Sequence, residues 1–209
     1  MTVIIPKQST IALENRKINS VSSIIVMQRM GLNFRLGQVS NMPTMTILNM
    51  WKWAVFGQVS RSFFSERLAL SLGLRADGCN YTGKTAALYR QISPRFSFSY
   101  AFDERWSLNG NIGRYYQLPA YTTLGFADAG GVLVNKRNKT GYIGADHYVL
   151  GVEYRPGTTT RITLEGFYKT YDHYPVSLTD SVALANKGTD YVAVGDEAVR
   201  PVGEGRAYG

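Results

Sequence analysis

The sequence predicts an all-β protein, folded as an antiparallel up-and-down meander of long hairpins. Three observations lead to this prediction. Apolar and polar residues alternate along most of the chain after residue 50, short turns alternate with long loops, and large aromatic residues gather where the alternating segments end. Together they indicate a sheet with one apolar and one polar face, as in a partial transmembrane β-barrel.

The alternation marks six segments in which every second residue is apolar. They are 53–64, 68–77, 95–102, 106–113, 148–155 and 161–168, of which the first is the weakest. A period of two places all the apolar side chains on one face of a strand, whereas a helix would spread them around its surface. We therefore expect six strands, with the start of a seventh at 206–209.

The connections between these segments differ in length in a regular way. Residues 65–66, 103–105 and 156–158 are short polar reversals suited to hairpins. Long polar loops follow at about 78–89, at 119–146 and from 175 onward. Long loops without structure count against a compact soluble domain, but short turns at one end and long loops at the other are typical of outer-membrane barrels.

Aromatic residues on the apolar side fall at the strand ends, where girdles at the lipid headgroups are expected. They are Trp53, Phe63, Phe102, Trp106, Tyr116, Tyr154 and Tyr168. The opposite side carries charged and amide residues, which suit a wet lumen. Arg114 departs from the pattern because it continues the apolar side. Either its side chain extends to the polar rim, or a bulge shifts the register before it.

Composition excludes several classes of function. The 209 residues carry a net charge of +8, but the basic residues are scattered and form no run, so no nucleic-acid partner is expected. A single Cys excludes a disulfide scaffold, and one Cys with two His argues against a metal centre, so neither metal nor cofactor is expected. No apolar run reaches the roughly eighteen residues that a transmembrane helix needs.

Residues 1–50 differ from the rest of the chain. They hold all six Met and none of the fourteen Tyr, and they show no sustained period. Two interpretations are open: a poorly ordered or weakly strand-forming segment, or a segment of unrelated origin. We expect a boundary near residue 50, with 51–209 forming the partial barrel.

Three stretches resemble the barrel of a TonB-dependent outer-membrane receptor of the Bacteroidetes-like type. They are RFSFSYAFDERWSLNGNIGRYYQLPAY (95–121), GYIGADHYVLGVEYRP (141–156) and TRITLEGFYKTYDHYPV (160–176). The resemblance implies the outer membrane of a Gram-negative cell, a barrel of about 22 strands and a plugged lumen. It also implies three kinds of partner: the membrane lipid, a plug domain with the TonB complex, and a small-molecule or oligosaccharide ligand.

The chain departs from this family in length and in its ends. A barrel of that size needs several hundred residues, and no export signal, plug, TonB-box-like start or terminal aromatic strand is recognisable here. We therefore expect an interior fragment that does not transport by itself. Two alternatives stay open, a small outer-membrane barrel with an adhesive or structural role and a soluble β-sandwich binding module.

No enzyme signature is found, so no catalytic residue is assigned. Asp146 and His147 are adjacent, but neighbouring strand residues point to opposite faces. Ligand contacts are expected in the long loops, where aromatic and charged residues combine. The candidates are Tyr121, Asp128, Lys136, Arg137, Tyr142 and Tyr174. Arg161, Glu165 and Lys169 recur on the lumen side, where they either face the plug or form a hydrated wall.

Overall fold

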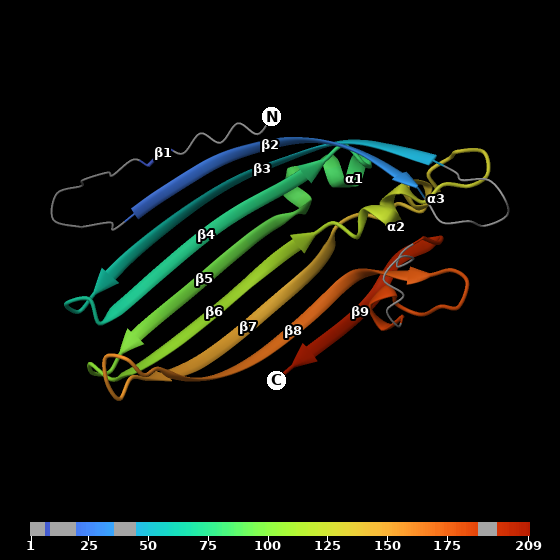
Figure 1. The fold of residues 1–209 in the computed structure, drawn as a ribbon. Helices are drawn as coiled ribbons and strands as arrows, with labels where there is room; N and C mark the ends of the chain where they lie inside the picture. The colour runs from blue at the N-terminus through green and yellow to red at the C-terminus, as the bar shows by residue number, and fades with distance from the viewer. Residues whose placement is uncertain (1–6, 9–19, 36–44, 188–195) are drawn as a thin grey trace.

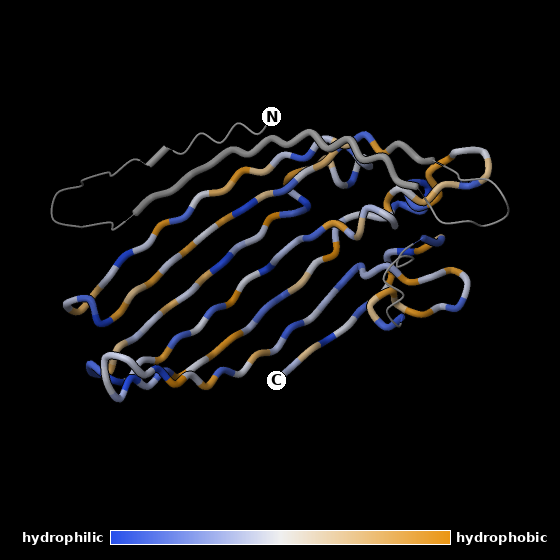
Figure 2. The backbone as a smooth tube through the Cα atoms, viewed as in Figure 1, coloured by the Kyte–Doolittle hydropathy of each residue, from blue (hydrophilic) through white to orange (hydrophobic). Residues whose placement is uncertain are grey.

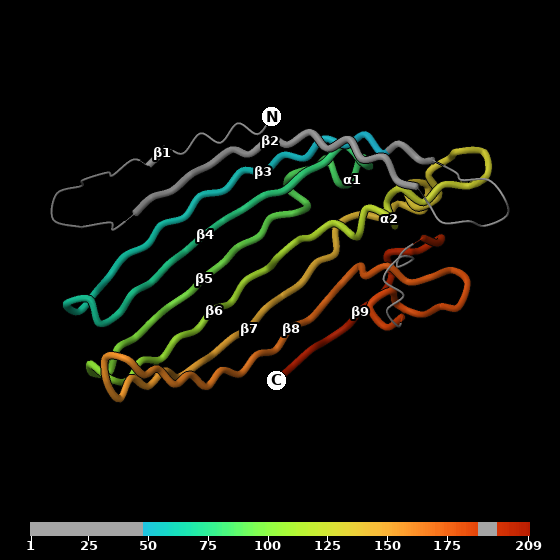
Figure 3. Tube along the Cα trace, in the orientation of Figure 1, coloured from blue at the N-terminus to red at the C-terminus, as the bar shows by residue number. Residues whose placement is uncertain are grey.

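The computed structural model describes residues 7–8, 20–35, 45–187 and 196–209, with side chains from residue 48 onward. They form one curved sheet of nine strands in chain order, each antiparallel to the next (Figures 1 and 3). The strands are β1 (Lys7–Gln8), β2 (Ser20–Arg35), β3 (Met45–Phe63), β4 (Leu68–Cys79), β5 (Ile92–Ala101), β6 (Trp106–Gln117), β7 (Ile143–Tyr154), β8 (Ile162–Ser177) and β9 (Val199–Tyr208). The predicted all-β meander is confirmed.

The strand register brings the apolar residues of all the predicted strands onto one face. Leu72 pairs with Phe96, Phe96 with Ile112, and Ile112 with Tyr148, so one row crosses four strands. Alternating hydropathy along the coloured strands, β4 to β8, is visible in Figure 2. Leu72 is 63% exposed and Leu164 78% exposed, so this face is not covered by protein within the described residues. A large exposed apolar surface fits contact with lipid acyl chains.

The two ends of the sheet differ, as the loop lengths predict. Tight turns lie at one end, and the short helices gather at the other (Figure 1). The helices are α1 (Gly83–Ala86), η1 (Leu88–Arg90), α2 (Tyr121–Gly125), α3 (Val134–Arg137) and η2 (Leu184–Asn186). In the β5–β6 turn, Asp103 Oδ1 accepts the backbone N–H groups of Arg105 and Trp106 at 2.7 and 2.8 Å. These bonds stabilise the carboxylate and lower the pKa of Asp103.

The buried core of the described residues lies at the loop end of the sheet. Leu48 and Met50 of β3 pack with Cys79, Tyr81, Leu118 and Leu124. No helix in the described part of the chain has the length and apolarity required to cross a membrane.

The structure differs from the sequence-based expectations at two strands. Residues 1–50 showed no period, yet β2 pairs with β3 from Ser20 to Arg35. Apolar residues occupy both odd and even positions of this segment, as at 24–27, and this obscures the alternation. Likewise, β9 begins at Val199 and not near residue 206. Here Pro201 and two glycines interrupt the apolar pattern, so pairing with β8 is needed to define the strand.

Candidate functional site: a cavity beneath the β6–β7 loop

The β6–β7 loop (118–142) crosses the loop end of the sheet from β3 to β9. On the β3 side, α2 begins at Tyr121, whose hydroxyl accepts a hydrogen bond from Lys52 Nζ at 3.3 Å. Tyr81 follows β4, and its hydroxyl donates to the Leu124 carbonyl at 2.7 Å. Burial raises the pKa of Tyr81, so this donor stays protonated at any physiological pH. These contacts fix one end of the loop over the core.

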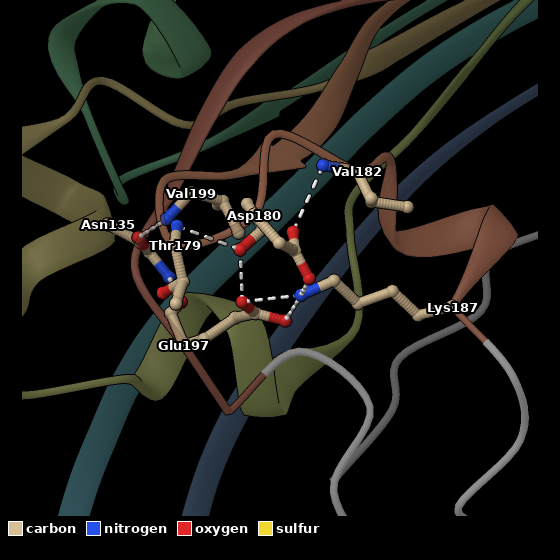
Figure 4. Close-up of polar contacts among 8 residues, drawn as sticks. Asn135, Thr179, Asp180, Val182, Lys187, Glu197 and Val199 are labelled. Carbon is tan, nitrogen blue, oxygen red and sulfur yellow. Dashed lines mark hydrogen bonds and ion pairs between the residues drawn. The ribbon is translucent and has the colours of Figure 1, made fainter.

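Asn135 of α3 fixes the other end of the loop to β9. Its amide nitrogen donates to the carbonyls of Thr123 and Glu197 at 2.7 and 2.8 Å, and its oxygen accepts from Val199 N–H at 2.8 Å. Figure 4 shows this side chain pointing toward the start of β9. Asn135 and Val199 are both fully buried. The loop therefore joins the first and last of the strands β3 to β9 through side chain–backbone hydrogen bonds.

A cluster of charged residues anchors the β8–β9 connection next to this contact (Figure 4). Lys187 Nζ lies 2.6 Å from Glu197 Oε1 and 2.8 Å from Asp180 Oδ2. Glu197 also accepts a hydrogen bond from the Ser177 hydroxyl at the end of β8. Hydrogen bonds from Lys187 and from the Val182 N–H lower the pKa of Asp180. The two connections are thus held together around the start of β9.

A cavity of about 620 Å³ lies beneath these loops. Its walls come from the ends of β6, β7 and β8, from the start of the β6–β7 loop and from η2. The lining residues are Tyr115, Tyr116, Gln117, Leu118, Pro119, Ala120, Thr123, Ile143, Ala145, His147, Tyr171, Tyr174, Pro175 and Leu184. Three of these residues, Tyr115, Ala145 and Tyr171, form one row across β6, β7 and β8. Their neighbours along each strand point to the apolar face, so this row, and the cavity that it lines, lies on the lumen side.

Aromatic rings dominate the polar side of this cavity. The Tyr115 ring lies 4.5 Å from the His147 ring and 4.4 Å from the Arg95 guanidinium, so it is held between two neighbours. Tyr171 and Tyr174 stand on β8 and are half-buried. Rings fixed in this way can stack on planar or sugar ligands with little loss of side-chain entropy.

The adjacent Asp146 and His147 do not form an acid–base pair. Asp146 faces the apolar side, where its Oδ2 lies 2.9 Å from Arg114 Nη1. His147 contacts Tyr115 on the lumen side. The pairing of β6 with β7 runs through Arg114 without a shift, so no bulge precedes this residue.

Of the six residues predicted to contact a ligand, Tyr174 lines the cavity. Asp128 instead accepts N–H groups of Gly130 and Val132 and pairs with Arg137 at 3.2 Å. Lys136 Nζ lies 6.0 Å above the Tyr81 ring. Tyr121 and Tyr142 pack against the core. Ligand contacts by all six residues stay predictions.

The three predicted lumen residues lie on the polar side of β8 and its turn and do not line the cavity, although Lys169 stands opposite its residue His147. Arg161 Nη2 lies 2.5 Å from Glu153 Oε2. Lys169 Nζ lies 4.9 Å from the centre of the Phe167 ring, and Glu165 is exposed opposite Gly151. Whether they face a plug or water stays a prediction.

Sequence reasoning missed Tyr115, Gln117, His147 and Tyr171 as cavity residues. They lie just outside the predicted strands 106–113, 148–155 and 161–168, and none of them was named as a ligand candidate. A signal was present, because all four stand within a few residues of a long loop on the lumen side. In the described residues, no three His, Cys, Asp or Glu side chains converge as metal ligands would.

Comparison with known proteins identifies the architecture. Residues 30–209 match the family model described as TonB dependent receptor-like, beta-barrel. The chain also resembles the crystal structure of the siderophore receptor PirA from Pseudomonas aeruginosa, with a TM-score of 0.55 and 13% sequence identity. The match covers 91% of this chain and 38% of that receptor. No curated protein sequence matches the chain.

Proposed function

The chain belongs to the family of TonB-dependent receptor-like β-barrels, and from this premise we propose that it forms part of the wall of an outer-membrane receptor that takes up a scarce nutrient. Barrels of this family reside in the outer membrane and act as receptors and not as enzymes. The chain spans 38% of the length of PirA, so the remaining strands, the plug and the TonB complex are partners in the proposed receptor.

The cavity beneath the β6–β7 loop is the observation that supports ligand capture. It lies on the lumen side, it is bordered by a loop that joins β3 to β9, and its Tyr115 ring is held between His147 and Arg95. Tyr171 and Tyr174 of β8 add two further aromatic rings to its lining.

Iron chelates are the first ligand class to test. PirA is a siderophore receptor, and aromatic rings beside a guanidinium suit ligands that combine planar groups with negative charge. In this chain the Arg95 guanidinium provides the positive charge next to Tyr115. Below the cavity, Arg161, Glu165 and Lys169 present charged groups that we assign to the surface facing the plug.

The orientation of the sheet can be tested with spin labels. A label at Leu72 or Phe98 is expected to be relaxed by oxygen dissolved in lipid and not by a water-soluble nickel chelate. A label at Ser71 or Ser97, the next residue on the same strands, is expected to show the reverse. If Leu72 and Phe98 are open to the nickel chelate, the membrane location of this face is refuted.

Ligand capture can be tested with a ferric tris-catecholate as the probe. Tyr171→Ala, on the lumen side of β8, is expected to weaken binding by about tenfold, the effect of losing about 1–1.5 kcal/mol of aromatic contact. Tyr168→Ala, on the apolar side of the same strand, is the matched control and is expected to bind as the wild type does. Equal binding by both variants would count against the cavity as the capture site.

A further inference from the structure

A second cavity, of about 470 Å³, lies at the loop end between the β4–β5 loop, the β6–β7 hairpin and β9. Five of its lining side chains are cationic: Lys84, Arg90, Arg114, Lys139 and Arg200. No Asp or Glu is among its lining residues. A depression lined by this many cations and no acid favours an anion with several oxygen acceptors.

This cavity lies on the apolar side of the sheet and not on the lumen side. Arg114 follows Ile112 by two residues, so the two side chains share a face. Both border a smaller depression together with Leu72 and Tyr148 of the apolar face. On β9, Arg200 alternates with Val199, which is fully buried beneath the loops, so Arg200 points away from the lumen.

The position of the cavity coincides with the upper limit of the apolar band. Ile112 and Tyr148 form the last apolar pair between β6 and β7, and the next pair on that face is Arg114 with Asp146. Along β6, the stretch from Trp106 to Arg114 matches the roughly 9–11 residues of a membrane-spanning strand. The cations therefore stand at the level where lipid headgroups begin.

Most of these cations have no carboxylate partner. Lys84, Lys139 and Arg200 are exposed and make no ion pair with any described residue. Arg90 contacts only the ring of Tyr89, at 5.6 Å. By contrast, Arg114 is fixed by Asp146 and Asp172 and provides a rigid floor. Unpaired cations around a fixed one are suited to a phosphate group.

We propose that this cavity binds the phosphate group of a lipid headgroup in the outer leaflet. The continuity with the apolar face decides between a lipid and a soluble anion, since acyl chains attached to the phosphate would lie along Leu72, Ile112 and Tyr148. The inference rests on the outer-membrane location of the family and is independent of nutrient uptake.

The test compares two charge-matched double variants of the full chain in detergent micelles, with the strand content checked by circular dichroism. Lys139→Gln/Arg200→Gln removes two cations from the cavity. Arg67→Gln/Arg105→Gln removes two exposed cations at the opposite end of the sheet. The probe is bisphosphorylated lipid A, and bound lipid is measured by native mass spectrometry. The cavity variant is expected to bind about 30-fold more weakly, since two cations near an anionic lipid contribute about 2 kcal/mol.

Three results would overturn the proposal. The first is equal binding by the two double variants, and the second is no binding of lipid A by the wild-type chain. The third is equally tight binding of glucose phosphate, a soluble anion, which would assign the cavity to a solute and not to a lipid. If the double variant loses strand content, Lys84→Gln, a single change in the β4–β5 loop, tests the same cavity. Lys84→Gln is expected to bind lipid A about fivefold more weakly than the wild type.

Discussion

Arg114 of β6 stands opposite Asp146 of β7 on the apolar face, with Nη1 2.9 Å from Oδ2. The same guanidinium also pairs with Asp172 of β8 and donates to the Tyr116 hydroxyl at 2.8 Å. One cation thus links three consecutive strands at the height where the apolar band ends. The residue that broke the sequence pattern is the centre of an ion-pair network.

Arg114→Leu is expected to destabilise the folded chain by about 1 kcal/mol. The substitution extends the apolar face but leaves two carboxylates without their cation. The side chains of Arg114 and Asp146 are 30% and 33% exposed, so solvent screening keeps the effect modest. Urea unfolding in micelles measures it, with Arg67→Leu in an exposed turn as control. Adding Asp146→Asn and Asp172→Asn should restore stability, and a failure to do so would argue against the network.

A charge placed at mid-height on the apolar face should be far more costly than one on the lumen side. Leu150→Arg is expected to destabilise the protein by about 2–4 kcal/mol in lipid. Asn111→Arg, on the lumen side and opposite the neighbouring Val149, is expected to change stability by less than about 1 kcal/mol. Unfolding in lipid vesicles provides the measurement. Similar losses for both variants would contradict the assignment of the two faces.

Asn135→Ala should release the β6–β7 loop from β9. Alanine leaves the Thr123 and Glu197 carbonyls and the Val199 N–H without their partner, which costs about 1–3 kcal/mol locally. The expected result is faster cleavage of the loop in limited proteolysis. Arg137→Ala, two residues along the same helix and exposed, is the control and should leave the cleavage rate close to that of the wild type.

The β8–β9 connection should loosen in acid. The pKa of Asp180 is lowered in the folded state by Lys187 and the Val182 N–H. The stability that the Asp180 carboxylate gives the connection is therefore fully present above the ordinary aspartate pKa. It is lost as the pH falls through the lowered folded value. The protection of amides at 178–187 from hydrogen exchange, relative to their intrinsic rate at each pH, should therefore decrease below about pH 4. Asp180→Asn should remove much of this change in hydrogen exchange on acidification. If the change is the same in the variant, other carboxylates cause it.

Within the candidate site, the sequence predicted one of the residues that line the cavity. Tyr174 was identified because it belongs to a long polar segment with other aromatic residues. Tyr115 was not, because a strand pattern states which face a residue occupies and not what lies above that face. Tyr171 follows the last predicted strand, 161–168, and was not named as a candidate. The role of Asp128 was equally hidden, since a turn that satisfies its own N–H groups has the same composition as a ligand-binding loop.

The sequence by itself determined the alternation of faces along β4 to β8 and the end at which the long loops lie, because a period of two and the turn residues are local properties. Only the tertiary structure decided that β2 joins the sheet, that Asn135 reaches Val199, and that five cations from distant segments surround one depression on the apolar side. The last two relations depend on how the long loops fold back over the ends of the strands. Contacts between distant segments leave no periodic trace in the chain.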